Sequence, residues 1–207
     1  MRYLFIHGLG QNPSSWDKTI SFMPDSIHAQ CPDLAALLDG KEATYANLYS
    51  AFSGLCEEIS EPLNLCGLSL GGVLALNYAI DYPGKVRSLT LIATPYKMPK
   101  TLFKIQNIIF RLMPKSTFHK MGFQKKDFIQ LANSMVNLDF SERIKDILCA
   151  VLVICADKDY INKKPAKDLS GKILGAKFAL IEDAGHEVNV DNPQKLAAEL
   201  EMFFNGI

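Results

Sequence analysis

The chain has 207 residues, of which 48% are hydrophobic and 21% are charged. These values are typical of a globular protein with one core, and they exclude a disordered chain. Acidic and basic residues balance at 22 each, so no global charge favours nucleic acid or a membrane as a partner. The five cysteines form no C-x-x-C pair, and we expect free thiols in a reducing, cytoplasmic compartment.

Apolar runs that alternate with helical patterns predict the fold. Strands are expected at 3–6, 27–31, 63–66, 88–93, 148–156 and 177–181, and helices at 44–59, 70–82 and 194–204. The run 148–156 is continuously apolar, which is typical of a central parallel strand. Strands that alternate with helices predict an α/β fold with an open, mostly parallel sheet and helices on both faces.

Two apolar segments could be mistaken for targeting or membrane signals. The run at 3–6 is too short for the apolar part of a signal peptide. Residues 62–80 carry no charge, and they approach the length that spans a bilayer. Proline, glycine and asparagine interrupt this second segment, so we expect a strand, a glycine turn and a buried helix there.

Between Thr94 and Asp146 the strand pattern stops and helical periodicity continues. One expected helical face contains residues 102, 105, 109 and 112, and another contains residues 128, 131, 135 and 138. An insertion of this size between two strands is typical of a lid rather than a second domain. We therefore expect a single domain over 1–207, with a helical lid insertion at 95–147.

A serine between glycines is the strongest chemical signal. The segment Gly67-Leu68-Ser69-Leu70-Gly71 joins an expected strand to an expected helix. Glycines two positions to either side of a serine relieve the clashes of a sharp strand-to-helix turn. A serine nucleophile also needs a base, a group that orients the base, and donors for an oxyanion. A structural glycine turn with an incidental serine is the alternative.

His186 is the candidate base because it follows the last expected strand and comes after Ser69 in the chain. The other three histidines fit this role less well. His28 lies beside an expected strand and His119 lies in the insertion, whereas His7 precedes a glycine and is expected to pack or to form a hydrogen bond.

The acid that orients the base should lie in the loop after the strand at 148–156. Asp159 is favoured over Asp157 because it lies further into this loop, where its side chain can turn toward His186. Asp183 is a third alternative.

Two backbone N–H groups are candidates for the oxyanion hole. The turn itself aims the N–H of Leu70 at the site. The second candidate is the N–H of Leu9 in His7-Gly8-Leu9-Gly10, where the glycines let the loop curl toward a substrate carbonyl. The sequence has no metal-ligand cluster and no nucleotide-binding loop, so we expect neither a metal nor a cofactor.

The chain resembles the α/β-hydrolase superfamily over nearly its whole length. The matching segments are FIHGLGQNPSSW (5–16), LCGLSLGGVLALNYAIDYPGKVRSLTLIATP (65–95), VLVICADKDY (151–160) and EDAGHEVNVDNPQKLAAEL (182–200). The resemblance implies a catalytic triad of Ser69, Asp159 and His186, with Leu9 and Leu70 in the oxyanion hole. A serine nucleophile excludes the haloalkane dehalogenase and epoxide hydrolase branches, which use an aspartate there.

The chain departs from this family in three places. It begins directly at the His-Gly strand, so the family's first two strands are expected to be missing. The loop after the next strand is reduced to residues 32–36, and Ala156 replaces the usual glycine before the acid. These departures leave the substrate class open.

The expected activity is hydrolysis of a small carboxylic ester through an acyl-enzyme. A thioesterase, a carbon–carbon hydrolase or a lyase would use the same residues, and a catalytically silent ligand-binding homologue is a further alternative. The expected partner is a small ester or thioester, with no nucleic acid, and the oligomeric state is open.

The expected lid carries basic side chains and no acidic ones between residues 97 and 126. The basic residues are Lys97, Lys100, Lys104, Arg111, Lys115, Lys120, Lys125 and Lys126. A solvated polar face above an apolar underside is the favoured interpretation. The alternative is a patch that attracts an anionic substrate such as acyl-CoA, or an anionic membrane surface.

Overall fold

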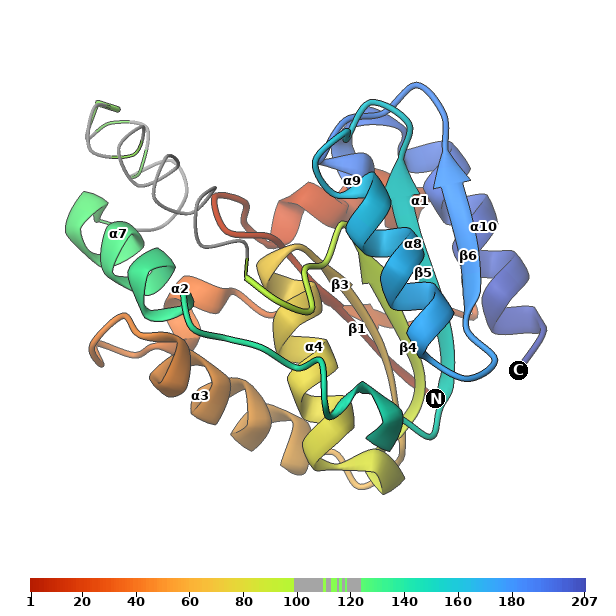
Figure 1. The fold of residues 1–207 in the computed structure, drawn as a ribbon, viewed down its shortest axis with the longest axis horizontal. Coiled ribbons are helices and arrows are strands. Elements are labelled where there is room, and N and C mark those ends of the chain that lie inside the picture. The colour runs from red at the N-terminus through yellow and green to blue at the C-terminus, as the bar shows by residue number, and fades with distance from the viewer. Residues whose placement is uncertain (99–109, 111–112, 115, 117, 119–123) are drawn as a thin grey trace.

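A computed structural model describes residues 1–98, 110, 113–114, 116, 118 and 124–207 (Figure 1). It contains a six-stranded sheet in the order β2-β1-β3-β4-β5-β6. The strands are β1 (Arg2–Ile6), β2 (Ala29–Gln30), β3 (Leu63–Leu68), β4 (Val86–Ile92), β5 (Ala150–Ala156) and β6 (Lys177–Ile181). Every pair of neighbours is parallel, which confirms the expected α/β fold with an open parallel sheet.

Helices cover both faces of the sheet (Figure 1). The α-helices are α1 (Asp17–Ser21), α2 (Leu34–Leu37), α3 (Tyr45–Glu57), α4 (Leu70–Asp81), α7 (Lys125–Ser134), α8 (Lys163–Lys172), α9 (Val188–Asp191) and α10 (Pro193–Asn205). Short 3₁₀ helices lie at Pro13–Trp16, Pro83–Lys85 and Ile144–Asp146. Helices α3, α4 and α8 lie on one face, and α1 and α10 lie on the other.

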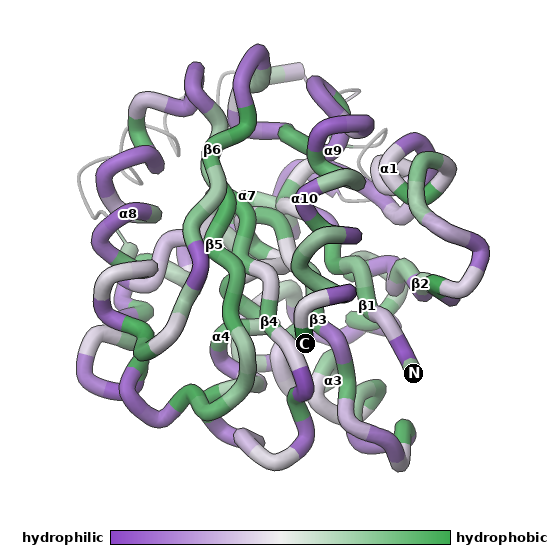
Figure 2. Tube along the Cα trace, turned by 90° about the vertical axis from the view of Figure 1, so that its right-hand side faces the viewer, coloured by the Kyte–Doolittle hydropathy of each residue, from purple (hydrophilic) through white to green (hydrophobic). Residues whose placement is uncertain are grey.

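Two hydrophobic clusters sandwich the sheet, and β5 contributes to both. Val151, Val153 and Cys155 pack into the cluster beneath α3, α4 and α8. The alternating residues Leu152 and Ile154 pack into the cluster beneath α10. A strand buried on both faces has no polar side to alternate with, which explains its continuously apolar sequence. Figure 2 shows this contrast, with β5 hydrophobic and the outer helix α8 largely hydrophilic.

The segment 62–80 forms β3, a turn at Ser69 and most of α4, as expected. Ten of the twelve residues of α4 are buried, so this helix is apolar all round because it lies in the core of the fold. No helix within the described residues is both long and apolar enough to cross a membrane.

Two expected strands are shorter in the structure, and one helix was missed. The strand expected at 27–31 is reduced to the two residues of β2, and β5 begins at Ala150, after the exposed Leu148. Helix α8 was not expected. Only Ala166 and Leu169 are buried among its ten residues, so its sequence carries little apolar periodicity.

The described part of the insertion contains helix α7. Phe128, Leu131 and Met135 are buried as the expected apolar face requires. The face expected at residues 102, 105, 109 and 112 lies outside the described residues. An isolated antiparallel bridge joins Lys97 to Asp139 at the base of the insertion, and a salt bridge of 2.8 Å joins their side chains.

All five cysteines are free thiols, as expected. Cys56, Cys66 and Cys155 are buried, whereas Cys31 and Cys149 are partly buried. Burial raises the pKa of Cys31 to about 11 and that of Cys56 to about 12. At neutral pH these thiols are therefore protonated and poorly nucleophilic.

Candidate active site

Ser69 forms the sharp turn between β3 and α4. Its backbone has φ 52° and ψ −112°, a strained conformation for a residue with a side chain. Two backbone hydrogen bonds hold the turn in place. The Ser69 N–H donates to the carbonyl of Ile92 at 2.9 Å, and the Ser69 carbonyl accepts from Val73 N at 3.0 Å. Strain held in this way is typical of a side chain that must be presented at a fixed position.

The glycines around Ser69 are required by close backbone contacts. A Cβ atom on Gly67 would lie 2.4 Å from the carbonyl of Gly71, and one on Gly71 would lie 2.2 Å from the carbonyl oxygen of Ile6. These separations are far below contact distance, as the motif predicted. Gly72 is equally constrained, since its Cβ would lie 1.9 Å from Oγ1 of Thr94, although it lies outside the five-residue serine motif.

The His7–Gly10 loop lies directly against this turn. A Cβ on Gly8 would lie 3.6 Å from Cβ of Ser69 and 2.8 Å from the side chain of Leu68. Within the part of the chain that the structure describes, the N–H groups of Leu9 and Leu70 have no hydrogen-bond acceptor. Leu9 directly follows Gly8 and Leu70 directly follows Ser69, so both candidate oxyanion donors belong to the two segments that meet here.

His7 serves as a structural link in this loop, as expected. Its Nε2 accepts a hydrogen bond from Leu34 N at 3.2 Å, so Nδ1 carries the proton and donates to the carbonyl of Gly8 at 2.9 Å. Burial lowers the pKa of His7, although the Gly8 carbonyl and the charge of Asp33 partly oppose this effect. A neutral His7 therefore ties the loop to the start of α2.

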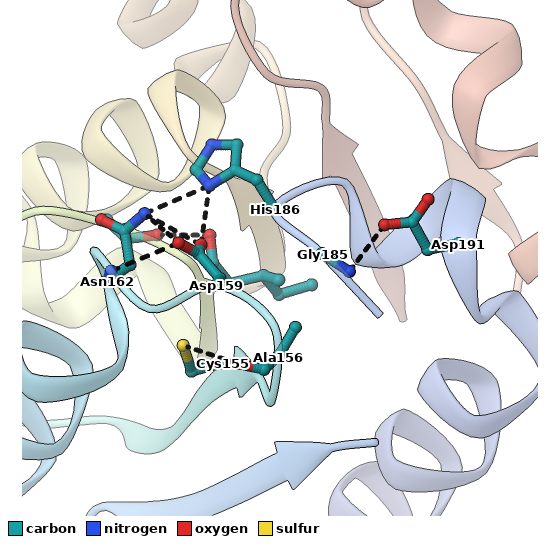
Figure 3. Close-up of polar contacts among 9 residues, drawn as sticks. Cys155, Ala156, Asp159, Asn162, Gly185, His186 and Asp191 are labelled. Carbon is teal, nitrogen blue, oxygen red and sulfur yellow. Dashed lines mark hydrogen bonds and ion pairs between the residues drawn. The ribbon is translucent and has the colours of Figure 1, made fainter. Parts of the chain in front are cut away.

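Asp159 and His186 meet above the ends of β5 and β6 (Figure 3). His186 Nδ1 lies 2.8 Å from Asp159 Oδ2, and Asp159 is buried at 6% exposure. The two rejected alternatives face other partners. Asp157 accepts a hydrogen bond from Ala184 N at 3.3 Å, and Asp183 forms an exposed ion pair with Lys158.

The charge on Asp159 sets the proton position on His186. Burial opposes ionisation of this carboxyl, but hydrogen bonds from His186 and Asn162 outweigh burial, and the pKa of Asp159 lies below its usual value. An ionised carboxylate can only accept hydrogen bonds. The proton therefore sits on Nδ1 of His186, which leaves the lone pair of Nε2 free to act as a base.

The loop that carries His186 is held by residues that sequence reasoning missed. Asp191 Oδ2 accepts a hydrogen bond from Gly185 N at 2.7 Å (Figure 3). Asn189 follows three positions after His186 and is completely buried. Its side chain bonds to Gln11, at the end of the His7–Gly10 loop, and to Ser15. The side chains of Gln11 and Asn189 do not stand out in the sequence, because a buried pair of polar residues leaves no periodic pattern.

The remaining predicted residues are not joined to this pair. Among the described residues, the hydroxyl of Ser69 has no hydrogen-bond partner; serine–base contacts are often long in the absence of substrate. His28 is exposed beside β2, and His119 lies outside the described residues. No group of three or more metal-ligating side chains occurs in the described part of the chain.

The basic residues of the insertion are described in part. Lys97 is paired with Asp139, so one charge of the expected patch is neutralised. Lys125 Nζ donates to the carbonyl of Met113 at 2.7 Å, and Lys126 is exposed. The other five basic residues lie outside the described residues.

Parallel strands, a strained serine turn and an Asp–His pair at the carboxyl edge together define an α/β protein of the hydrolase type. The alpha/beta hydrolase family model matches residues 3–199, and the chain belongs to this family.

Known proteins resemble the chain in sequence and in fold. The monoacylglycerol lipase abhd6-B of Xenopus laevis is 22% identical over a gapped alignment of 259 residues, which covers 99% of this chain and 75% of the relative. A pimeloyl-[acyl-carrier protein] methyl ester esterase of Neisseria meningitidis is 34% identical over 89 residues, 43% of this chain and 34% of the relative. The structure of a thermophilic esterase from Thermogutta terrifontis superimposes on this chain with a TM-score of 0.84 and 20% sequence identity. The superposition covers 100% of this chain and 90% of the esterase chain.

Proposed function

We propose that the protein is a serine hydrolase that cleaves a small carboxylic ester through an acyl-enzyme. Ser69 is the nucleophile, His186 the general base and Asp159 the residue that orients it. The observation that carries the proposal is the 2.8 Å contact between His186 Nδ1 and Asp159 Oδ2, at the same carboxyl edge of the sheet as the strained serine turn that follows β3. Three relatives whose names describe ester cleavage support an ester as the substrate.

The proposed reaction uses these three residues in two steps. Nε2 of His186 takes the proton of Ser69 as Oγ attacks the ester carbonyl, and the N–H groups of Leu9 and Leu70 stabilise the oxyanion. Collapse of the tetrahedral intermediate expels the alcohol, which takes the proton from His186. Water then attacks the acyl-enzyme by the same route, releasing the carboxylic acid and restoring Ser69.

A fluorophosphonate probe and a series of p-nitrophenyl esters of graded chain length test this proposal. We expect the wild type to be labelled and to hydrolyse one or more esters, and we expect Ser69→Ala to abolish both. Ser21→Ala is the matched control, since its hydroxyl bonds only to a nearby helical carbonyl. Absence of labelling in the wild type, or labelling that survives Ser69→Ala, would refute the serine mechanism.

The bond class is tested in the same series. Acyl-CoA thioesters are included beside the neutral esters, at low and at high salt. Preference for a thioester would reassign the substrate while keeping the mechanism.

We further propose that residues 95–147 are a lid on the single domain, because α7 packs its apolar face inward next to α3.

A further inference from the structure

Asn162 is the third member of the hydrogen-bonded group formed by Asp159 and His186 (Figure 3). Its Nδ2 lies 3.0 Å from Asp159 Oδ1, 2.9 Å from Oδ2, and 3.2 Å from Nδ1 of His186. Its backbone N–H also donates to Oδ1 at 3.3 Å. The carboxylate therefore receives donors from one residue on both of its oxygens.

The position of Asn162 makes this arrangement unusual. It is the residue immediately before α8, where an asparagine side chain commonly caps the first free N–H groups of the helix. Here the side chain makes no such bond. It turns instead toward Asp159 and His186, so helix α8 loses its usual cap in favour of this contact.

The proton arrangement also depends on Asn162. An amide nitrogen only donates, so its two hydrogens must point at acceptors. The ionised Asp159 is the acceptor that both Asn162 Nδ2 and His186 Nδ1 can reach. With Asn162 holding both oxygens in place, Oδ2 remains directed at Nδ1, and the His186 proton stays on that nitrogen.

We propose that Asn162 is a positioning residue that fixes the Asp159 carboxylate, and through it the orientation and protonated nitrogen of His186. The proposal rests on the proposed function for its catalytic consequence, but its geometric part is independent of any substrate. Asn162 acts through Asp159 and His186, so its loss should lower kcat and leave KM unchanged.

Two substitutions test the proposal. We expect Asn162→Ala to lower kcat about tenfold, in line with other hydrogen-bonding partners that support a catalytic group. The nearly isosteric Asn162→Asp should lower kcat further, because its carboxylate repels Asp159. Thr44→Ala is the control: it removes the α3 cap and should lower the Tm without changing kcat. An unchanged kcat in both folded Asn162 variants would overturn the proposal.

A nitrogen-15 NMR spectrum of the imidazole rings provides a readout that needs no activity. We expect His186 in the wild type to show one form, protonated at Nδ1, and Asn162→Ala to show a mixture with the form protonated at Nε2. An unchanged His186 signal in the variant would overturn the proposal. If the wild type shows this signal but neither labels nor hydrolyses esters, the proposed function fails while the role of Asn162 in holding the pair stands.

Discussion

Gln11 and Asn189 lie 178 positions apart in the chain, and their side chains form a hydrogen bond of 3.1 Å in a buried space. Gln11 Oε1 also accepts from Gly8 N, and Asn189 Nδ2 donates to the carbonyl of Ser15. This pair joins the loop that carries Leu9 to the segment that follows His186. The segments that carry the proposed oxyanion donor Leu9 and the proposed base His186 are thereby held to one another.

Loss of this link should destabilise the protein and reduce catalysis. Asn189→Ala leaves the buried Nε2 of Gln11 without its acceptor, which should cost about 1–3 kcal/mol in the free energy of unfolding. Urea denaturation measures that cost, and kcat for an ester measures the effect on the site. Ser170→Ala, which removes an exposed hydroxyl that donates to the carbonyl of Lys167, should change stability much less; equal losses in the two variants would contradict the assignment.

The glycine contacts predict opposite outcomes at two positions. Gly71→Ala places a Cβ 2.2 Å from the backbone oxygen of Ile6, so it should lower the free energy of unfolding by about 3 kcal/mol or prevent folding. Gly54→Ala meets no atom within 4 Å on helix α3 and should stabilise the protein by up to about 1 kcal/mol. Thermal unfolding of both variants checks the pair, and a stable, active Gly71→Ala would contradict the strained turn.

The choice between Asp159 and Asp183 as the partner of His186 can be tested by amide substitution. Asp159→Asn replaces the carboxylate by a neutral amide whose NH2 group can donate to His186 Nδ1 and shift the proton to Nε2, so kcat should fall by about 10³–10⁴. Asp183→Asn changes only an exposed ion pair with Lys158 and should leave kcat near the wild-type value. An esterase assay of both variants measures the two kcat values. A larger loss of kcat in Asp183→Asn than in Asp159→Asn would mean that Asp183 orients His186.

The burial of neutral His7 predicts that stability falls in mild acid. Its folded pKa is lowered, so the unfolded chain takes up the proton first as the pH drops below about 6.5. Stability from this residue is thus complete above that pH and is lost as the pH falls toward the folded pKa. Urea unfolding at pH 7.5 and 5.5 should show a smaller difference for His7→Asn than for the wild type. An identical difference would mean that His7 is not the group responsible.

Several elements could be predicted because their signals are local. Strand β6 has the predicted bounds, and α3 begins after Thr44, whose hydroxyl accepts from Asn47 N. The serine turn was equally predictable, since the clashes that Gly67 and Gly71 avoid involve short-range geometry. Helix α8 was missed because its outer surface is polar, and Asn162 was missed because no helix was expected after it and an asparagine in a loop carries no signal of its own.

The sequence by itself determined the order of strand, serine turn and helix, and the order of the candidate nucleophile, acid and base along the chain. Only the tertiary structure decided which aspartate meets His186. Asp157 N donates to the carbonyl of Ile181, which extends the pairing of β5 with β6 by one residue and turns the Asp157 side chain to Ala184. Asp159 lies two residues beyond that pairing and is free to face the histidine. Such a choice depends on the register between strands and on loop contacts, which residue spacing alone does not encode.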